Sequence, residues 1–248
     1  MLLRRDGDDV IAIGQPAHAW LSGQLARAWG NERFGAVEPW EEVCLAAEQH
    51  DVGMAAWERR PTLNPETGLP RSFMELDLEE HLEIWWSAAP LVIPQSRYAA
   101  LLVSLHGTAL YERRDLDDER ARAFLAGQAE LQARLLESLR ADPNTAAVAA
   151  DEVVRRNQRL VWTWDSLSLG LLLDWSPFEL KAVPAAGGEL SIDVGDGTLD
   201  PWPFRAPRIA LRCEGRRLAG RFDDEEAMHE ALAAAQWVTF EIAVASGR

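Results

Sequence analysis

The sequence predicts a mainly α fold of the α+β class, a helical bundle with a small peripheral β-sheet. Apolar residues recur with helical spacing over about 16–176. Short alternating runs, punctuated by Gly and Pro, fill about 187–245, and an Asp-Gly turn divides two short runs within 1–14. We therefore expect a single domain spanning 1–248, with a helical core at about 16–176 and the other two segments forming the sheet. Two domains with a boundary near residue 180 are the alternative.

The helical core contains six expected helices separated by turn signals. Pro16 opens the first and Gly30 closes it, which is the usual placement of these residues at helix ends. The six expected helices are 16–30, Pro39–Asp51, Leu76–Ala88, Pro94–Glu112, Leu116–Arg140 and Ala146–Trp175. The segment Arg59–Phe73 is rich in Pro and Gly, and we expect a long loop there that covers a functional site.

The expected strands lie at the two ends of the chain. They are Leu2–Arg5, Val10–Ile13, Leu190–Val194, Arg208–Cys213, Arg217–Phe222 and Trp237–Val244. A short helix at Asp223–Ala235 is expected between the last two strands.

The charge and cysteine content limit the kinds of partner. The net charge is −15, which disfavours nucleic acids and anionic membranes, and no basic run is interleaved with aromatic residues. No apolar stretch approaches the ~20 residues of a membrane helix. Cys44 and Cys213 are too far apart for a Cys-x-x-Cys motif, so we interpret them as buried free thiols of a cytoplasmic protein. Whether the protein is a homodimer stays open.

Four histidines and two aspartates fall on apolar helix faces. His18, His50, His81 and His106 each belong to a different expected helix, and Asp165 has Val161, Leu169 and Leu172 as helical neighbours. A buried carboxylate is costly unless it is paired or binds a metal. One such histidine is more often a hydrogen-bonded core residue than a ligand. The combination with Asp51 and Asp165 instead favours a site for a first-row transition metal between facing helices.

The order of these residues resembles the HD superfamily of metal-dependent phosphohydrolases. His18, then His50-Asp51-Val52-Gly53, then Asp165 is similar to the family's pattern, over roughly Pro16 to Trp175. The resemblance implies an HD-like helical bundle holding one or two divalent ions of iron, manganese or zinc. The implied ligands of the first ion are His18, His50, Asp51 and Asp165, and His81 and His106 would hold a second ion bridged by Asp51.

The whole chain also resembles a bacterial family of unknown function. The similar stretches are Gln49–Gly53, Trp57-Glu58, Thr67–Pro70 to Phe73, Ser104–His106 and Trp202–Phe204. This second resemblance implies no known activity.

One position departs from the HD pattern. Many HD hydrolases have a Lys after the Gly, where this chain has Met54, and Lys181 is its only lysine. A substrate phosphate would then need arginines, for which Arg59, Arg71 and Arg97 are the candidates, although each is also a typical solvated surface residue.

The function expected from these residues is hydrolysis of a phosphate ester or anhydride in a small-molecule substrate. Asp51 and His50 would be the central catalytic residues, and a metal-bound water would attack phosphorus. A mixed-valent di-iron oxygenase and a non-enzymatic binding protein are the alternatives. The first would show an oxygen-dependent iron spectrum, and the second would bind no metal.

Overall fold

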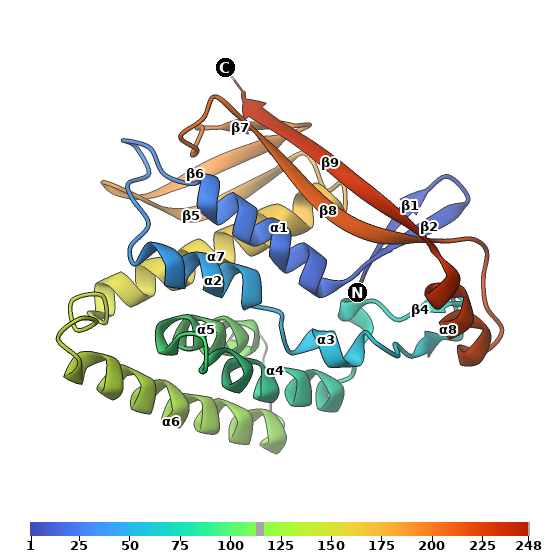
Figure 1. Cartoon of the computed structure of the whole chain (residues 1–248), viewed down its shortest axis with the longest axis horizontal. Coiled ribbons are helices and arrows are strands. Elements are labelled where there is room, and N and C mark those ends of the chain that lie inside the picture. Colours follow the sequence, from blue (N-terminus) through green and yellow to red (C-terminus); the bar gives the residue numbers. More distant parts are fainter. Residues whose placement is uncertain (113–116, 248) are drawn as a thin grey trace.

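A seven-stranded, curled β-sheet forms one side of the molecule (Figure 1). The computed structural model describes residues 1–112 and 117–247. The strand order is β1-β2-β8-β9-β7-β6-β5, and all neighbours are antiparallel except β7 and β9. The strands are β1 (Leu2–Asp6), β2 (Asp9–Ile13), β5 (Phe178–Ala185), β6 (Gly188–Gly195), β7 (Thr198–Asp200), β8 (Arg208–Leu218) and β9 (Gln236–Ser246).

This large sheet contradicts the predicted fold class. The fold is α+β, and it is neither a mainly helical bundle with a small peripheral sheet nor an HD-domain bundle. The prediction missed β5 and β7, because β5 mixes charged residues with Pro184 and has a register shift between Leu180 and Val183. Strand β8 contains the expected strand Arg208–Cys213 and continues to Leu218, so only the first two residues of the expected strand Arg217–Phe222 are in a strand.

The helices follow the apolar periodicity closely. They are α1 (Gln15–Ala28), α2 (Trp40–Gln49), α3 (Met54–Trp57), α4 (Leu78–Val92), α5 (Arg97–Glu112), α6 (Glu119–Ala141), α7 (Asp151–Leu172) and α8 (Glu225–Ala234). The expected start of the fifth helix, Leu116, lies outside the described residues. The expected long loop contains a short hairpin with two residues in each strand, β3 (Leu63–Asn64) and β4 (Leu69–Pro70). A 3-10 turn at Phe73–Glu75 follows this hairpin.

Helices α1 and α7 lie between the sheet and the remaining large helices (Figure 1). Helix α1 contacts β8 and α7 contacts β5, while both also contact α2. Trp29, at the end of α1, meets Phe34, Trp164 and Phe204 edge-on, with ring centroids 5.4–5.8 Å apart. Such aromatic packing fixes α1 and α7 against each other, and these two helices carry polar side chains of the candidate site.

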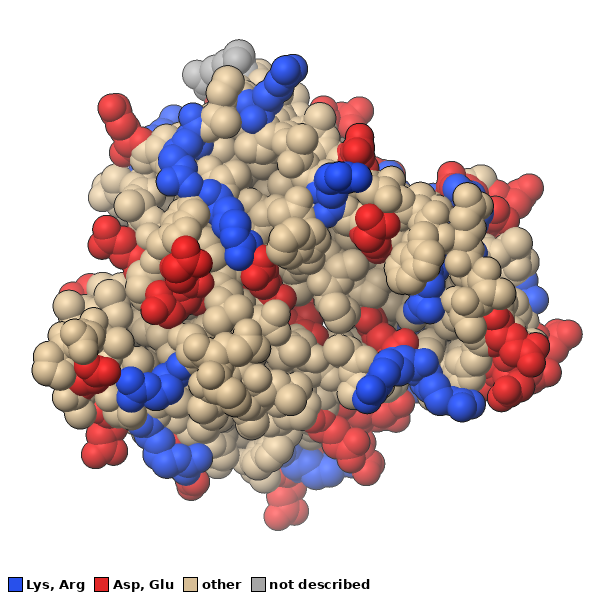
Figure 2. Space-filling model, viewed as in Figure 1, with Lys and Arg blue, Asp and Glu red and all other residues tan. Residues whose placement is uncertain are grey.

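The surface carries mixed charges. On the face drawn in Figure 2, basic side chains lie among acidic ones. Within 1–112 and 117–247, no helix is both long and apolar enough to span a lipid bilayer. Cys44 and Cys213 are buried and free of any disulfide.

Candidate metal centre

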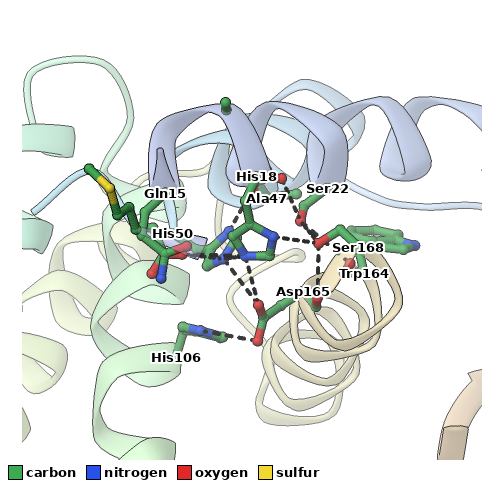
Figure 3. Close-up of polar contacts among 12 residues, drawn as sticks. Gln15, His18, Ser22, Ala47, His50, His106, Trp164, Asp165 and Ser168 are labelled. Carbon is green, nitrogen blue, oxygen red and sulfur yellow. Dashed lines mark hydrogen bonds and ion pairs between the residues drawn. The ribbon is translucent and has the colours of Figure 1, made fainter. Parts of the chain in front are cut away.

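Four buried polar side chains from three parts of the chain meet beneath α1 (Figure 3). His18 comes from α1, His50 and Asp51 from the turn that ends α2, and Asp165 from α7. The two histidines have no exposed surface, and the aspartates are at most 8% exposed. The structure therefore brings together residues separated by 147 positions in the sequence.

The nitrogen and oxygen atoms that face one another are unusually close. His18 Nε2 lies 3.2 Å from His50 Nε2, 3.0 Å from Asp165 Oδ1 and 3.4 Å from Asp51 Oδ2. His50 Nε2 lies 3.2 Å from Asp51 Oδ2 and 3.4 Å from Asp165 Oδ1. Ligand atoms around an ion with bonds of about 2.0–2.2 Å are separated by about 3.0–3.5 Å when they occupy adjacent positions. These buried His and Asp groups could hold a metal ion.

The far side of the His18 ring is held by a serine. Ser168 Oγ donates to the carbonyl oxygen of Asp165 at 2.9 Å and lies 2.8 Å from His18 Nδ1. Because the Ser168 proton is directed to that carbonyl, the hydroxyl oxygen accepts the hydrogen bond from His18 Nδ1–H. Ser22 Oγ, 2.8 Å from Ser168 Oγ, completes the buried network. The neutral His18 ring then carries its lone pair on Nε2, which faces the cluster.

The His50 ring is oriented in the same way by the backbone. Its Nδ1–H donates to the carbonyl oxygen of Ala47 at 2.8 Å. A neutral His50 ring therefore also directs its Nε2 lone pair into the cluster. A hydrogen bond on the remote ring nitrogen is the usual companion of a metal-ligating histidine.

The electrostatics of the cluster without an ion favour charged side chains. Burial by itself would lower the pKa values of His18 and His50, but Asp51 and Asp165 outweigh it and raise both. Burial would likewise raise the pKa values of the two aspartates, and the histidines hold both well below their usual range. Protons therefore occupy the position that a cation could take, and a divalent ion would compete with them.

His106, on α5, stands beside this set. Its Nε2 lies 3.8 Å from Asp165 Oδ2, and with His50 and Asp165 it forms a second group that could hold a metal. Its Nδ1 is buried and has no hydrogen-bond partner among the described residues. Burial, together with the nearby His50, lowers the pKa of His106 to about 4, so its ring is neutral at physiological pH.

His81, on α4, is not part of either group. Its Nδ1 is hydrogen-bonded with the hydroxyl of Tyr111, and its Nε2 accepts a hydrogen bond from Trp85 Nε1 at 3.1 Å. The side chain lines the cavity next to the cluster, but both ring nitrogens are engaged by aromatic neighbours. Its role as a metal ligand stays a prediction.

Gly53 allows the turn after Asp51 to approach α4. A Cβ atom at this position would overlap the carbonyl oxygen of Ile84, which belongs to the α4 backbone. The turn itself is closed by hydrogen bonds from Val52 N to Gln49 O and from Met54 N to Asp51 O. Only glycine fits this close backbone approach, which sets the position of Asp51.

Glu58 ties the same segment to the start of α1. Its carboxylate accepts hydrogen bonds from the backbone N–H of Gln15 and pairs with the Met1 ammonium at 2.7 Å. Burial raises the pKa of Glu58 despite that ammonium. A carboxylate at a helix N-terminus interacts favourably with the helix dipole, so Glu58 fixes the turn of α1 that carries His18.

A cavity of about 190 Å³ opens beside the cluster. Polar lining side chains include His18, Asp51, His106, Asp165 and Gln15. The remaining lining residues are Met54, Phe73, Met74, Leu76, His81, Trp85, Leu110 and Leu169. Phe73 ends the loop Arg59–Phe73 that was expected to cover the site. Met74 and Leu76 lie within three residues after that loop.

The three candidate arginines lie outside this lining. Arg59 is exposed, and Arg71 pairs with Glu80 at 3.2 Å. Arg97 pairs with Asp142 at 3.2 Å, between α5 and α6. Their proposed contact with substrate therefore stays a prediction.

Three polar residues of the site were not singled out from the sequence. Ser168 and Ser22 orient His18, and Gln15 lines the cavity. A signal exists for the serines, because Ser168 follows Asp165 by three positions and Ser22 follows His18 by four, which places each pair on one helix face. Gln15 precedes His18 by three positions, so the same spacing could have identified it.

Comparison with known proteins gives a family and no activity. No curated protein and no solved structure matches the chain. The expected HD-superfamily membership is wrong, because the curled seven-stranded sheet does not belong to an HD-domain bundle. A family described as "Protein of unknown function (DUF3891)" matches residues 1–220, and the chain belongs to this family.

Proposed function

We propose that the protein is a metal-dependent hydrolase with one divalent ion bound by His18, His50, Asp51 and Asp165. The observation that carries this proposal is the 3.2 Å separation of the two Nε2 atoms, whose rings both direct their Nδ1–H outward. The Nε2 lone pairs of the two neutral rings face each other beside two buried carboxylates, and positive charge between these groups would stabilise all of them. A divalent ion would satisfy all four groups at once, whereas a single proton would satisfy two.

The number of protein ligands favours manganese or iron over zinc. Four ligands fill the tetrahedral shell that zinc prefers, and catalytic zinc sites keep one position open for water. An ion with six positions would keep two for water and substrate. A His2Asp2 set suits such an ion because imidazole and carboxylate are both ligands of iron and manganese.

The hydrolytic step follows from this arrangement. A bound divalent ion lowers the pKa of a coordinated water toward ~7. The carboxylates of Asp51 and Asp165 would hold the ion and balance its charge. His106 has a neutral ring beside Asp165, and it could accept a hydrogen bond from the coordinated water and orient that water.

The alternatives differ in what they require of the site. A di-iron oxygenase needs a full second set of ligands, and His81 would have to give up its hydrogen bonds with Tyr111 and Trp85 to join it. A non-enzymatic protein needs no ion, and it would use protons to satisfy the same four side chains. Phosphate esters stay among the predicted substrates.

The experiment is metal analysis of protein purified without chelator and then loaded with Mn2+, Fe2+ or Zn2+. We expect about one ion per chain and hydrolysis that is lost with EDTA and restored by metal. An oxygen-dependent iron spectrum without hydrolysis would favour the oxygenase. Absence of bound metal under all three conditions would overturn the proposal.

A further inference from the structure

In the part of the chain that the structure describes, the outer wall of the cavity beside the cluster carries no charged side chain. Among the described residues that line it, none is Lys or Arg, and the only carboxylates are Asp51 and Asp165. Met54, Phe73 and Leu110 contribute apolar surface. A volume of about 190 Å³ is below the ~300–1,000 Å³ of pockets for drug-sized ligands, so the substrate is small.

The charge of the loaded site depends on the number of ions. One divalent ion with Asp51 and Asp165 gives a net charge of zero, since two negative charges balance two positive ones. A dianionic phosphate would enter such a site without a compensating charge, at a high desolvation cost. Two ions would leave an excess of two positive charges, but the two groups that could each hold an ion have His50 in common.

Gln15 provides a polar group for an uncharged substrate. It lies one turn before His18 at the start of α1, lines the cavity and is 3% exposed. Its side-chain oxygen is buried and has no hydrogen-bond partner among residues 1–112 and 117–247. Rotation about the last side-chain bond exchanges the amide oxygen and nitrogen, so the group can donate to or accept from a ligand. A buried amide oxygen without a partner is costly, and a bound substrate that pairs with the carboxamide would reduce that cost.

We propose that the substrate is a small uncharged carboxylic ester or amide, bound through a hydrogen bond to the Gln15 carboxamide. This inference rests on the proposed metal-dependent hydrolase and narrows its substrate class. The ion would lower the pKa of a water molecule, the oxygen of that water would form a bond to the carbonyl carbon, and the bond from that carbon to the alcohol oxygen or amine nitrogen would break. The leaving group takes up one proton, and the products are a carboxylate and an alcohol or amine, with one further proton released when the acid ionises.

Two probes with the same leaving group test the charge preference. We would compare p-nitrophenyl acetate and p-nitrophenyl phosphate with manganese-loaded protein, and express each rate as the acceleration over EDTA-treated protein. We expect a metal-dependent acceleration for the acetate that is at least tenfold larger than for the phosphate. A larger acceleration for the phosphate would overturn the inference and leave the hydrolase intact. Hydrolysis of neither would overturn the inference, and metal content measured on the same sample would show whether the metal site itself survives.

A variant pair tests the role of Gln15. Gln15→Leu should raise KM for p-nitrophenyl acetate about 3- to 10-fold, the effect of losing one uncharged hydrogen bond, without changing metal content. Gln95→Leu makes the same change at an exposed position after α4 and should leave KM unchanged. Gln15→Met, which keeps the side-chain length, replaces Gln15→Leu if circular dichroism shows that the latter does not fold. An unchanged KM in the folded Gln15 variant would overturn the assignment.

Discussion

The Nε2 atoms of His18 and His50 lie 3.2 Å apart, although the two rings belong to separate helical segments and each is fixed by a different acceptor on its far side. Ser168 holds one ring and the carbonyl of Ala47 holds the other. Neither ring can turn its Nδ1 toward the cluster without losing a buried hydrogen bond. The pair is therefore prepared to share a cation, and this property leads to the following predictions.

Replacing a ligand should remove the ion. We expect His18→Ala to reduce metal content from about one ion per chain to nearly none, because three remaining ligands bind a divalent ion much more weakly. His229→Ala is the matched control. His229 lies on α8, away from the cluster, and its Nε2 is hydrogen-bonded to the carbonyl oxygen of Pro61. Elemental analysis after dialysis provides the measurement. Equal metal content in both variants would contradict the assignment.

A variant at His106 distinguishes a site that holds one ion from a site that holds two. With one ion, His106→Ala should keep the metal content of the wild type and lower hydrolytic activity, because the residue would orient the attacking water beside the ion. If a second ion is present, the same change should lower metal content from about two toward one. Elemental analysis and an activity assay on the same preparation distinguish these outcomes.

The hydroxyl of Ser168 should tune metal affinity without contacting the ion. Ser168→Ala leaves His18 Nδ1 without its acceptor, so the ring loses its fixed orientation. Loss of such a partner typically costs 10- to 100-fold in metal affinity. Ser87→Ala removes a hydroxyl that bonds only to its own helix, at Ile84 O, and serves as control. Competition titration with a metal indicator gives both values, and equal affinities would show that Ser168 has no such role.

The stability of the metal-free protein should depend on pH in a defined direction. The pKa values of His18 and His50 are raised above 6.5, so the stability that their protonated forms contribute is complete below about pH 6.5 and is lost as pH rises through the raised values. The pKa values of Asp51 and Asp165 are lowered below 3.8, so their contribution is present above about pH 3.8 and is lost on further acidification.

Bound metal should prevent the loss of stability that the metal-free protein shows at alkaline pH. Thermal unfolding with EDTA should show a midpoint that falls between pH 6.5 and 9, while protein loaded with Mn2+ should change less over that range. Metal affinity should rise with pH, since ions and protons compete for the same nitrogens. A midpoint that falls equally in both samples would show that the cluster is not responsible.

The turn at Gly53 should tolerate no side chain. Gly53→Ala places a methyl group against the carbonyl oxygen of Ile84, and overpacking of this kind costs about 1–3 kcal/mol. Gly187→Ala is the control, because a Cβ atom there meets nothing within 4 Å, and a surface change of this kind stays within about 0.5 kcal/mol. Urea unfolding of the two variants gives the comparison. Metal affinity of the Gly53 variant should fall as well, because Asp51 shifts with the turn.

The sequence predicted the convergence of the site better than the fold around it. His18, His50 and Asp165 interrupt apolar helix faces, and polar residues in such places must meet partners, so their clustering follows from local periodicity. His81 shows the same pattern, yet it pairs with Tyr111 and Trp85. Apolar periodicity predicts that a side chain is buried. It does not predict which neighbour forms its hydrogen bonds.

The extent of the sheet could not be predicted from local patterns. Strand β2 pairs with β8, about two hundred residues later, and pairing of this kind depends on the whole fold. Strand β5 contains Lys181 and Pro184, which are unusual in a strand, and its position is set by packing of α7 against it. The resemblance to HD proteins misled for a related reason, since a similar order of a few ligating residues does not specify the architecture that carries them.

Because the ligands come from α1, the end of α2 and α7, an ion between them would act as a cross-link across 147 residues of chain. Closing so long a loop removes more conformational freedom from the unfolded chain than a local turn does. Helix α7 and the end of α2 would then be unable to separate from α1 while the ion stays bound. Resistance to proteases would then depend on the metal even at sites far from the cavity.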